Sequence, residues 1–142
     1  MLRSMTQADA ERVQKLNAND LGYLYPLSSV KEKLAIILSN NHHYVLVYED
    51  AHGGVVGYVH GEIYETLYAP TVINILGLVV AETYQGRGIG KALMQGIENE
   101  AQKQGIQGIR LNSGADRGAA HQFYQHIGYR MDKEQKRFLK YF

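Results

Sequence analysis

The feature that most constrains the fold is an apolar run at residues 71–80 that leads through a glycine-rich segment into an amphipathic stripe. The run predicts a strand buried on both faces. Four apolar residues at helical spacing follow the glycines: Ile89, Leu93, Ile97 and Ala101. They predict a helix that ends at Gly105, and residues 106–112 predict another strand. A right-handed crossover of this kind places the helix N-terminus at the carboxyl end of its strand, where ligands bind in such sheets.

The glycine-rich segment reads QGRGIGK over residues 85–91. Glycine lets the backbone turn sharply and lets its N–H groups approach a ligand. A helix start adds unpaired amides and a positive dipole end, which favour a phosphate-bearing ligand, and Arg87 and Lys91 add positive charge. The segment is not a P-loop, because Gly86 and Gly90 are closer together than the P-loop glycines and Ala92 stands where a P-loop has a hydroxyl residue. The glycine spacing also differs from that of the dinucleotide-binding fingerprint. From this segment alone, a glycine-rich turn without a ligand stays open.

The remaining segments indicate further helices and strands. The predicted helices cover residues 7–17, residues from 29 onward and residues 117–126, and the predicted strands cover residues 44–49, 55–64 and 136–142. Thr6 and Ser29 begin capping boxes for the first two helices, whereas Asp116 is expected to cap the third and Gly128 to end it. The loop at residues 17–26 is either a plain connector or a cover for a pocket.

Composition excludes several classes of protein. A chain of 142 residues suffices for one compact domain, and a formal net charge of +1 provides no basic field for general nucleic-acid binding. The absence of cysteine excludes disulfides and thiolate nucleophiles, and the six histidines show no metal-site spacing, so we expect no metal. No stretch suits a signal peptide or a bilayer span, so we expect a soluble, cytoplasmic protein with no membrane partner.

A second constellation follows the glycine-rich segment and consists of Asn112, Arg117, Ala120, Phe123, Tyr124, Gly128 and Tyr129. Together with Gln85, Gly88 and Gly90, it resembles the GNAT superfamily of N-acetyltransferases. The signature of that family joins an apolar strand, a Q/R-x-x-G-x-G/A loop, a helix, another strand, and a helix with a tyrosine before a G-F or G-Y pair. The resemblance implies one N-acetyltransferase domain over residues 1–142. It also implies a mixed α/β fold, with a central twisted sheet flanked by helices and strands that splay apart at the cofactor site.

The resemblance implies acetyl-coenzyme A (acetyl-CoA) as the co-substrate. Backbone amides of the glycine-rich segment would hold the pyrophosphate, the pantetheine arm would pair with the preceding strand, and an N–H near Val79 or Val80 would polarise the thioester carbonyl. Arg117 stands where many members have asparagine, and it either contacts a CoA phosphate or merely begins the helix. The implied cofactor-binding residues are Leu78, Val79, Val80, Gln85, Gly86, Arg87, Gly88, Ile89, Gly90, Lys91, Asn112, Arg117 and Tyr124.

Two catalytic residues are expected. Tyr124 would protonate the departing CoA thiolate, because a phenol of pKa ~10 matches a leaving group of comparable basicity. Some family members take their base from the strand before the loop, but Asn74 occupies that position here, so Glu62 is the leading candidate for the base. His60 shares a strand face with Glu62. Either residue could instead be a solvent-facing polar position, and a water chain could replace the base.

The sequence therefore predicts an acetyl-CoA-dependent N-acetyltransferase that acts on a primary amine of a small molecule or peptide. Direct transfer in a ternary complex is expected, since cysteine is absent and no Ser-His-acid constellation is recognisable. Tyrosine-rich segments around Tyr23, Tyr25, Tyr64 and Tyr68, together with Glu62 and Glu65, favour a cationic, partly apolar acceptor. The alternative is a catalytically silent sensor that binds acyl-CoA, and formation of a homodimer stays open.

Overall fold

The computed structural model of the chain describes all 142 residues. The chain forms two compact units, Met1–Leu111 and Asn112–Phe142, which are described separately. The expectation of a single domain over residues 1–142 stays a prediction. None of the helices in either unit has the length and apolar character that a membrane crossing requires.

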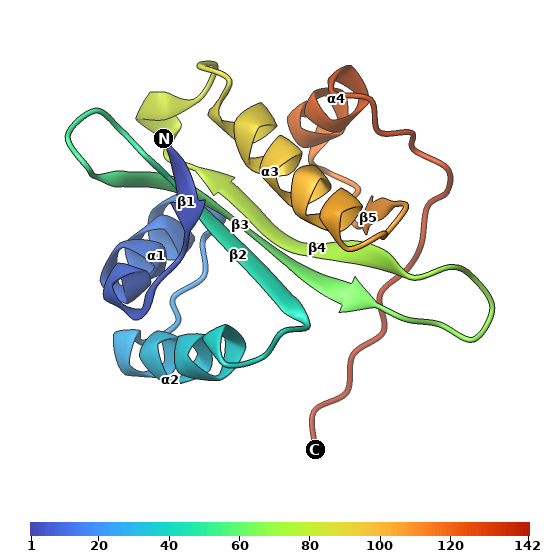
Figure 1. The fold of residues 1–142 in the computed structure, drawn as a ribbon, viewed down its shortest axis with the longest axis horizontal. Helices are drawn as coiled ribbons and strands as arrows, with labels where there is room; N and C mark the ends of the chain where they lie inside the picture. The colour runs from blue at the N-terminus through green and yellow to red at the C-terminus, as the bar shows by residue number, and fades with distance from the viewer. The chain divides into compact units, whose positions relative to one another are not determined.

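The first unit contains a five-stranded mixed sheet with the strand order β1-β2-β3-β4-β5 (Figure 1). Its strands are β1 Leu2–Ser4, β2 His43–Glu49, β3 Val55–Tyr64, β4 Val72–Val80 and β5 Ile109–Leu111. The first three pairings are antiparallel, and β4 pairs in parallel with β5. This confirms the predicted mixed sheet, hairpin and crossover. β5 is shorter than the strand predicted over residues 106–112.

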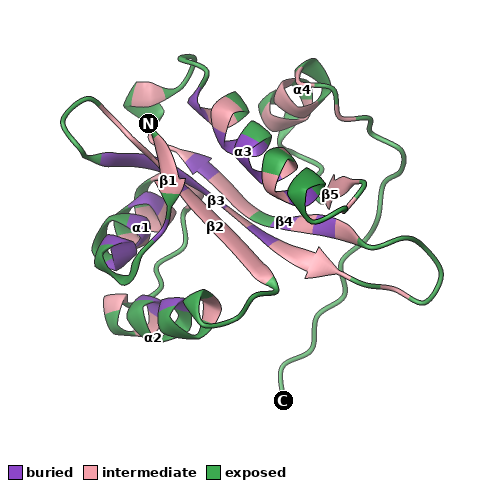
Figure 2. Ribbon diagram, in the orientation of Figure 1, coloured by how far each residue is buried: buried purple, intermediate pink, exposed green.

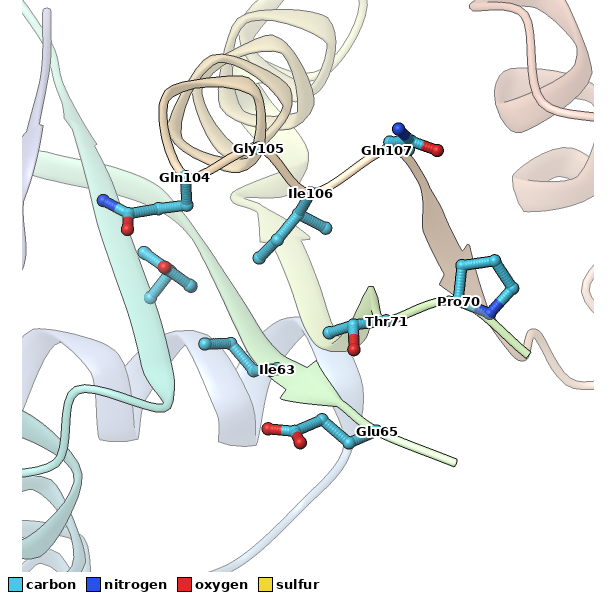
Figure 3. A pocket seen from close by; sticks show the side chains of 9 residues that line it. Ile63, Glu65, Pro70, Thr71, Gln104, Gly105, Ile106 and Gln107 are labelled. Carbon is cyan, nitrogen blue, oxygen red and sulfur yellow. The ribbon is translucent and has the colours of Figure 1, made fainter. Parts of the chain in front are cut away.

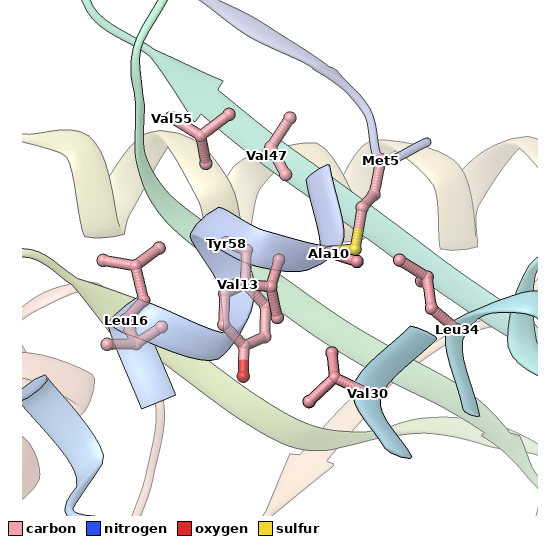
Figure 4. Packing of buried hydrophobic residues seen from close by; sticks show 10 residues of the cluster. Met5, Ala10, Val13, Leu16, Val30, Leu34, Val47, Val55 and Tyr58 are labelled. Atoms are coloured by element: carbon pink, nitrogen blue, oxygen red, sulfur yellow. The ribbon is translucent and has the colours of Figure 1, made fainter. Parts of the chain in front are cut away.

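Helices α1 (Ala10–Leu16) and α2 (Leu27–Leu38) cover one face of this sheet (Figure 1). A short 3-10 turn, η1 (Gln7–Asp9), precedes α1, and the Thr6 N–H donates to Asp9 Oδ2 at 2.8 Å, as the predicted capping box requires. The core between these helices and the sheet is apolar (Figure 4) and includes Val13, Leu16, Val30, Leu34, Val47, Tyr58 and Val79.

The second predicted helix exists, but its predicted start at the Ser29 box is wrong. α2 begins at Leu27, and Pro26 is its N-cap with φ −60°. The Val30 N–H donates to the Pro26 carbonyl at 3.0 Å, so the helical hydrogen bonds already begin at this proline, before Ser29.

Helix α3 (Ile89–Lys103) covers the opposite face of the sheet, and its inward residues are buried (Figure 2). Leu93, Met94 and Ile97 are fully buried there. Gly105, with φ +73°, follows the helix, as its predicted role as terminator requires. The connection β4–α3–β5 places the start of α3 just beyond the carboxyl end of β4, which is the edge that the sequence indicated for ligand binding.

The second unit contains one helix, α4 (Gly118–His126). Arg117, not Asp116, is the N-cap, so the predicted capping role of Asp116 is wrong. Gly128 ends the helix region with φ +102° as predicted. The predicted strand at residues 136–142 is absent, because these residues have no ladder partner and a strand satisfies its backbone only against another strand.

Candidate active site

The glycine-rich segment is a tight turn that only glycine accommodates without strain. A 3-10 turn, η3 (Glu82–Tyr84), follows β4, and Gly86 and Gly88 then adopt φ +78° and +83°. Gly88 is the N-cap of α3. All residues with positive φ in the chain are glycines, so the sequence places glycine where the backbone needs the left-handed region.

No side chain caps the first backbone amides of α3. The backbone ladder begins with the Ala92 N–H donating to the Gly88 carbonyl at 3.0 Å, no side chain caps the helix, and its first turn contains no acid. Arg87 lies exposed beside this turn, with its guanidinium 4.8 Å from the centre of the Tyr84 ring. Free amides, a positive dipole end and a cation together form an anion-binding surface.

One edge of β4 is open in the first unit. Pairing with β5 covers only Ile73–Ile75, whereas pairing with β3 continues to Val80. The Ala81 N–H donates to Val56 O on β3 at 2.8 Å, and the Val79 carbonyl also faces β3 beside Gly57. Because backbone groups alternate in direction along a strand, those of Val80 and Leu78 point to the open edge.

This alternation refines the expectation for the oxyanion donor. The amides available at the open edge are those of Leu78 and Val80, while the N–H of Val79 points to β3. The Gln85 side chain donates to the Val80 carbonyl at 3.1 Å and thereby ties the glycine turn to the end of β4. The open strand edge and the free helix amides are therefore adjacent along the chain and held together by Gln85.

A row of polar side chains crosses the sheet on the face that α1 and α2 cover. Glu62 and Asn74 are directly opposite each other, and Asn74 Nδ2 donates to Glu62 Oε1 at 3.2 Å. Arg110 on β5 donates to Asn74 Oδ1 at 2.7 Å, and its guanidinium lies 4.8 Å from the centre of the Tyr64 ring. Glu62 on β3 thus brings a carboxylate to the Asn74 position on β4, where the resemblance led us to look for an acid.

Two histidines extend this row. His43 Nδ1 and His60 Nε2 lie 2.9 Å apart, a distance at which one ring N–H donates to the other ring. Burial is the largest cause that lowers the pKa of His60 to about 4, the nearby His43 lowers it further, and Glu62 opposes both. His60 is therefore neutral at physiological pH. Sequence reasoning missed His43, because the cross-strand register that joins it to His60 leaves no local signal.

The loop expected at residues 17–26 folds partly into a π-helical turn, η2 (Asn17–Leu21). Tyr58 on β3 donates its hydroxyl proton to Asn17 Oδ1, and Asp20 Oδ1 accepts from the Glu82 N–H at 3.0 Å. Burial raises the pKa of Tyr58 to about 12, so its hydroxyl stays protonated. These bonds fix η2 beside β3 and the end of β4, and Tyr23 stands exposed just after η2.

Three expected site residues, Asn112, Arg117 and Tyr124, belong to the second unit. Within it, Tyr124 is half-buried on α4, and its ring packs edge-on against Phe123 and Tyr129, with centroids 5.2 and 6.0 Å away. Burial raises the pKa of the Tyr124 phenol, and Arg117 opposes this rise. The roles of these three residues, like those of the expected site residues of the first unit, stay predictions.

A separate open hollow of about 550 Å³ lies at the far end of α3, where Ile63, Thr71, Gln104 and Ile106 line it (Figure 3). α3 has 15 residues and is therefore about 22 Å long, so the hollow lies far from the glycine turn. Its lining contains one acid, Glu65, and no basic side chain. No group of three or more histidine, aspartate or glutamate side chains that could hold a metal ion occurs in the structure.

Comparison with known proteins identifies the family. The profile of the Acetyltransferase (GNAT) family matches residues 10–129. The chain belongs to the GNAT acetyltransferase family. The comparison with curated proteins gives no match.

Solved structures share the GNAT fold over nearly the whole chain. A transcriptional regulator from Bacillus halodurans C-125 matches with a TM-score of 0.88 at 22% identity, covering 99% of each chain. AAC(6')-Iy, solved with the bisubstrate analog CoA-S-monomethyl-acetylneamine, matches with a TM-score of 0.88 at 16% identity, covering 99% of this chain and 97% of that chain. Aminoglycoside antibiotic 6'-N-acetyltransferase AAC(6')-IG from Acinetobacter haemolyticus matches with a TM-score of 0.86 at 13% identity, covering 100% and 99%.

Proposed function

We propose that the protein is an acetyl-CoA-dependent N-acetyltransferase that transfers the acetyl group directly to a primary amine of a small molecule or peptide. The observation that carries this proposal is the junction between β4 and α3, where an open strand edge meets uncapped helix amides. A diphosphate fits the amides at residues 86–91, and an extended amide-bearing chain such as pantetheine fits the edge at Leu78 and Val80. Membership of the GNAT family supports the same cofactor.

Each chemical requirement of the transfer has a proposed residue. The Val80 N–H, or that of Leu78, polarises the thioester carbonyl and stabilises the oxyanion that develops on it. Tyr124 protonates the departing thiolate, and its raised pKa keeps the phenol protonated at neutral pH. The negative charge of the Glu62 carboxylate assists the acceptor ammonium in losing its proton. Asn112 and Arg117 are proposed as cofactor contacts on the grounds of the family resemblance alone.

A primary amine is the proposed acceptor. AAC(6')-Iy is named an aminoglycoside N-acetyltransferase and was solved with CoA, and an amine acceptor for this chain is consistent with that relationship. Glu62 and the exposed Tyr23 suit a cationic, partly apolar molecule. A cytoplasmic location and a homodimer stay predictions from the sequence.

Thiol release tests this function. Calorimetry first measures CoA binding, and thiol release from acetyl-CoA is then followed across a panel of primary amines, with N,N-dimethylated versions of the same compounds as the matched control. The proposal expects release with at least one primary amine and none with its dimethylated form. Tight CoA binding without turnover on any amine would instead favour the silent acyl-CoA sensor.

A further inference from the structure

The proposed function, on which the following inference rests, requires the acceptor amine to lose a proton near the thioester. Glu62 lies two residues further along β3 than His60 and faces Asn74, in the part of β4 that is still paired with β5. Its carboxylate already accepts a hydrogen bond from Asn74. His60 instead faces Gly77, the residue just before the open edge at Leu78. Because two residues of a strand span about 7 Å, His60 is the closer of the two to the proposed site of transfer.

Gly77 leaves room beside His60. A Cβ added at Gly77 would have the Tyr58 hydroxyl at 3.7 Å and the Tyr58 ring at 3.8 Å as its nearest neighbours, so this face of β4 carries no side chain there. The strand register shifts between His60 and Gly61, which makes Leu76 an extra residue on β4 and leaves its side chain 50% exposed. The bulge bends β4 at this point, and we expect the space beside Gly77, about that of a methyl group, to admit the amine end of an acceptor.

We propose that His60 is the group that directly takes the proton from the acceptor amine, with His43 as its positioning residue and Glu62 as its anionic neighbour. In the step, the neutral amine nitrogen attacks the thioester carbonyl carbon, and an N–H bond of the resulting cationic adduct then breaks with its electron pair staying on nitrogen. The proton binds Nδ1 of His60, the ring nitrogen that is not in contact with His43. The imidazolium then returns the proton to water.

His43 sets the tautomer that this step needs. For Nδ1 of His60 to hold a lone pair, Nε2 must carry the hydrogen, and it donates that hydrogen to Nδ1 of His43 across the observed 2.9 Å. In many enzymes a second group, often a carboxylate, orients the catalytic base through a hydrogen bond, and here the imidazole of His43 takes that place. The rings are 5.0 Å apart and tilted by 43°, so the contact runs through the ring nitrogens rather than through stacking.

Two titratable neighbours act on the protonation of His60 in opposite directions. The titratable groups that act on it are His43 from β2, which opposes its protonation, and Glu62 from its own strand, which favours it. Arg110 from β5 donates a hydrogen bond to Asn74. Tyr58 lies two residues before His60 on the same face of β3. The charged side chains of α2 are exposed, and they are Lys31, Glu32 and Lys33. Burial, the largest cause, lowers the pKa of His60 to about 4, so the ring is neutral at pH 7, and Glu62 stabilises the imidazolium that forms when the ring takes a proton.

The test compares variants of the active wild-type enzyme with the best amine of the panel. His60→Gln is expected to lower kcat by about 100-fold, the scale of a lost general base, with unchanged CoA affinity. His43→Gln is expected to lower kcat by about tenfold with little change in KM for the amine. The matched control is His42→Gln, whose exposed side chain neighbours His43 in sequence and should leave kcat unchanged.

Chemical rescue separates a base from a structural histidine. Imidazole added to His60→Ala is expected to restore turnover in proportion to the concentration of neutral imidazole, and it should not rescue Tyr124→Phe. Wild-type kcat in His60→Gln, or absence of rescue in a folded His60→Ala protein, overturns the assignment. If both His60 variants fail to fold, Gly77→Ala replaces them, because it fills the gap without a clash and should raise KM for the amine at least fivefold. An unchanged KM there also overturns the assignment.

These outcomes are distinct from failure of the proposed function. Wild-type protein that releases no thiol with any amine contradicts the acetyltransferase itself. Active wild-type protein together with an equally active His60→Gln variant contradicts only the role of His60.

Discussion

Replacing Gly88 by alanine tests whether the glycine turn binds the cofactor. Gly88 has φ +83°, a conformation in which an alanine costs about 1–2 kcal/mol. A Cβ at this position would meet no atom within 4 Å, so no clash adds to that cost. Gly53→Ala is the matched control, because Gly53 has φ +79°, equally open surroundings, and a place in the β2–β3 turn. Both variants should therefore lose about 1–2 kcal/mol in the free energy of unfolding.

The two variants should differ in CoA affinity. An alanine at position 88 relaxes toward negative φ and rotates the peptide groups that aim amides at the diphosphate. Loss of one hydrogen bond to a charged oxygen costs about 1.5–3 kcal/mol. That free energy corresponds to a dissociation constant for CoA raised about 10- to 150-fold.

Urea unfolding and calorimetry with CoA make the comparison. The expected result is equal destabilisation of both variants and weakened CoA binding in Gly88→Ala only. If the two variants were destabilised equally and bound CoA with the same affinity, the assignment of the diphosphate to this turn would be refuted.

Three further predictions follow from the structure. Gly57→Ala should weaken CoA binding, because its Cβ would lie 2.9 Å from the Val79 carbonyl and displace β4, and calorimetry checks this against the CoA affinity of the parent protein. Tyr124→Phe should lower kcat by about 100-fold with little change in CoA affinity, and unchanged kcat would remove its role as the acid. Asp9→Asn should lower the free energy of unfolding at pH 7 by about 2 kcal/mol, because Asp9 is paired with Arg3 at 2.9 Å in a partly buried contact. The hydrogen bond from Arg3 lowers the pKa of Asp9, so this stabilisation is complete above the unfolded pKa of about 3.9 and is lost as pH falls further. Urea melts between pH 7 and pH 2 should therefore show an acid-dependent loss in the parent protein that is smaller in the variant, and equal losses would contradict the role of Asp9.

The sequence predicted the sheet and the crossover because their signals are local. Residues 55–64 and 72–80 carry uninterrupted strand patterns, and α3 carries a clear helical stripe. The glycine turn was also predictable, since positive φ at Gly86 and Gly88 demands glycine.

Other features depend on partners distant in the sequence. The contact between His43 and His60 depends on the β2–β3 register, and the extra residue Leu76 depends on the β3–β4 register. Neither register can be predicted from a local sequence pattern. The prediction of a strand at residues 136–142 was wrong for the same reason, because the local alternation of side chains does not show whether a partner strand is present.

Amide chemical shifts of isotope-labelled protein titrated with CoA test the central claim most directly. The account predicts that the largest changes fall on residues 86–91 and on Leu78 and Val80, whose amides face the open edge of β4. Changes confined to the hollow around Gln104 and Ile106, or no changes at all, would contradict it.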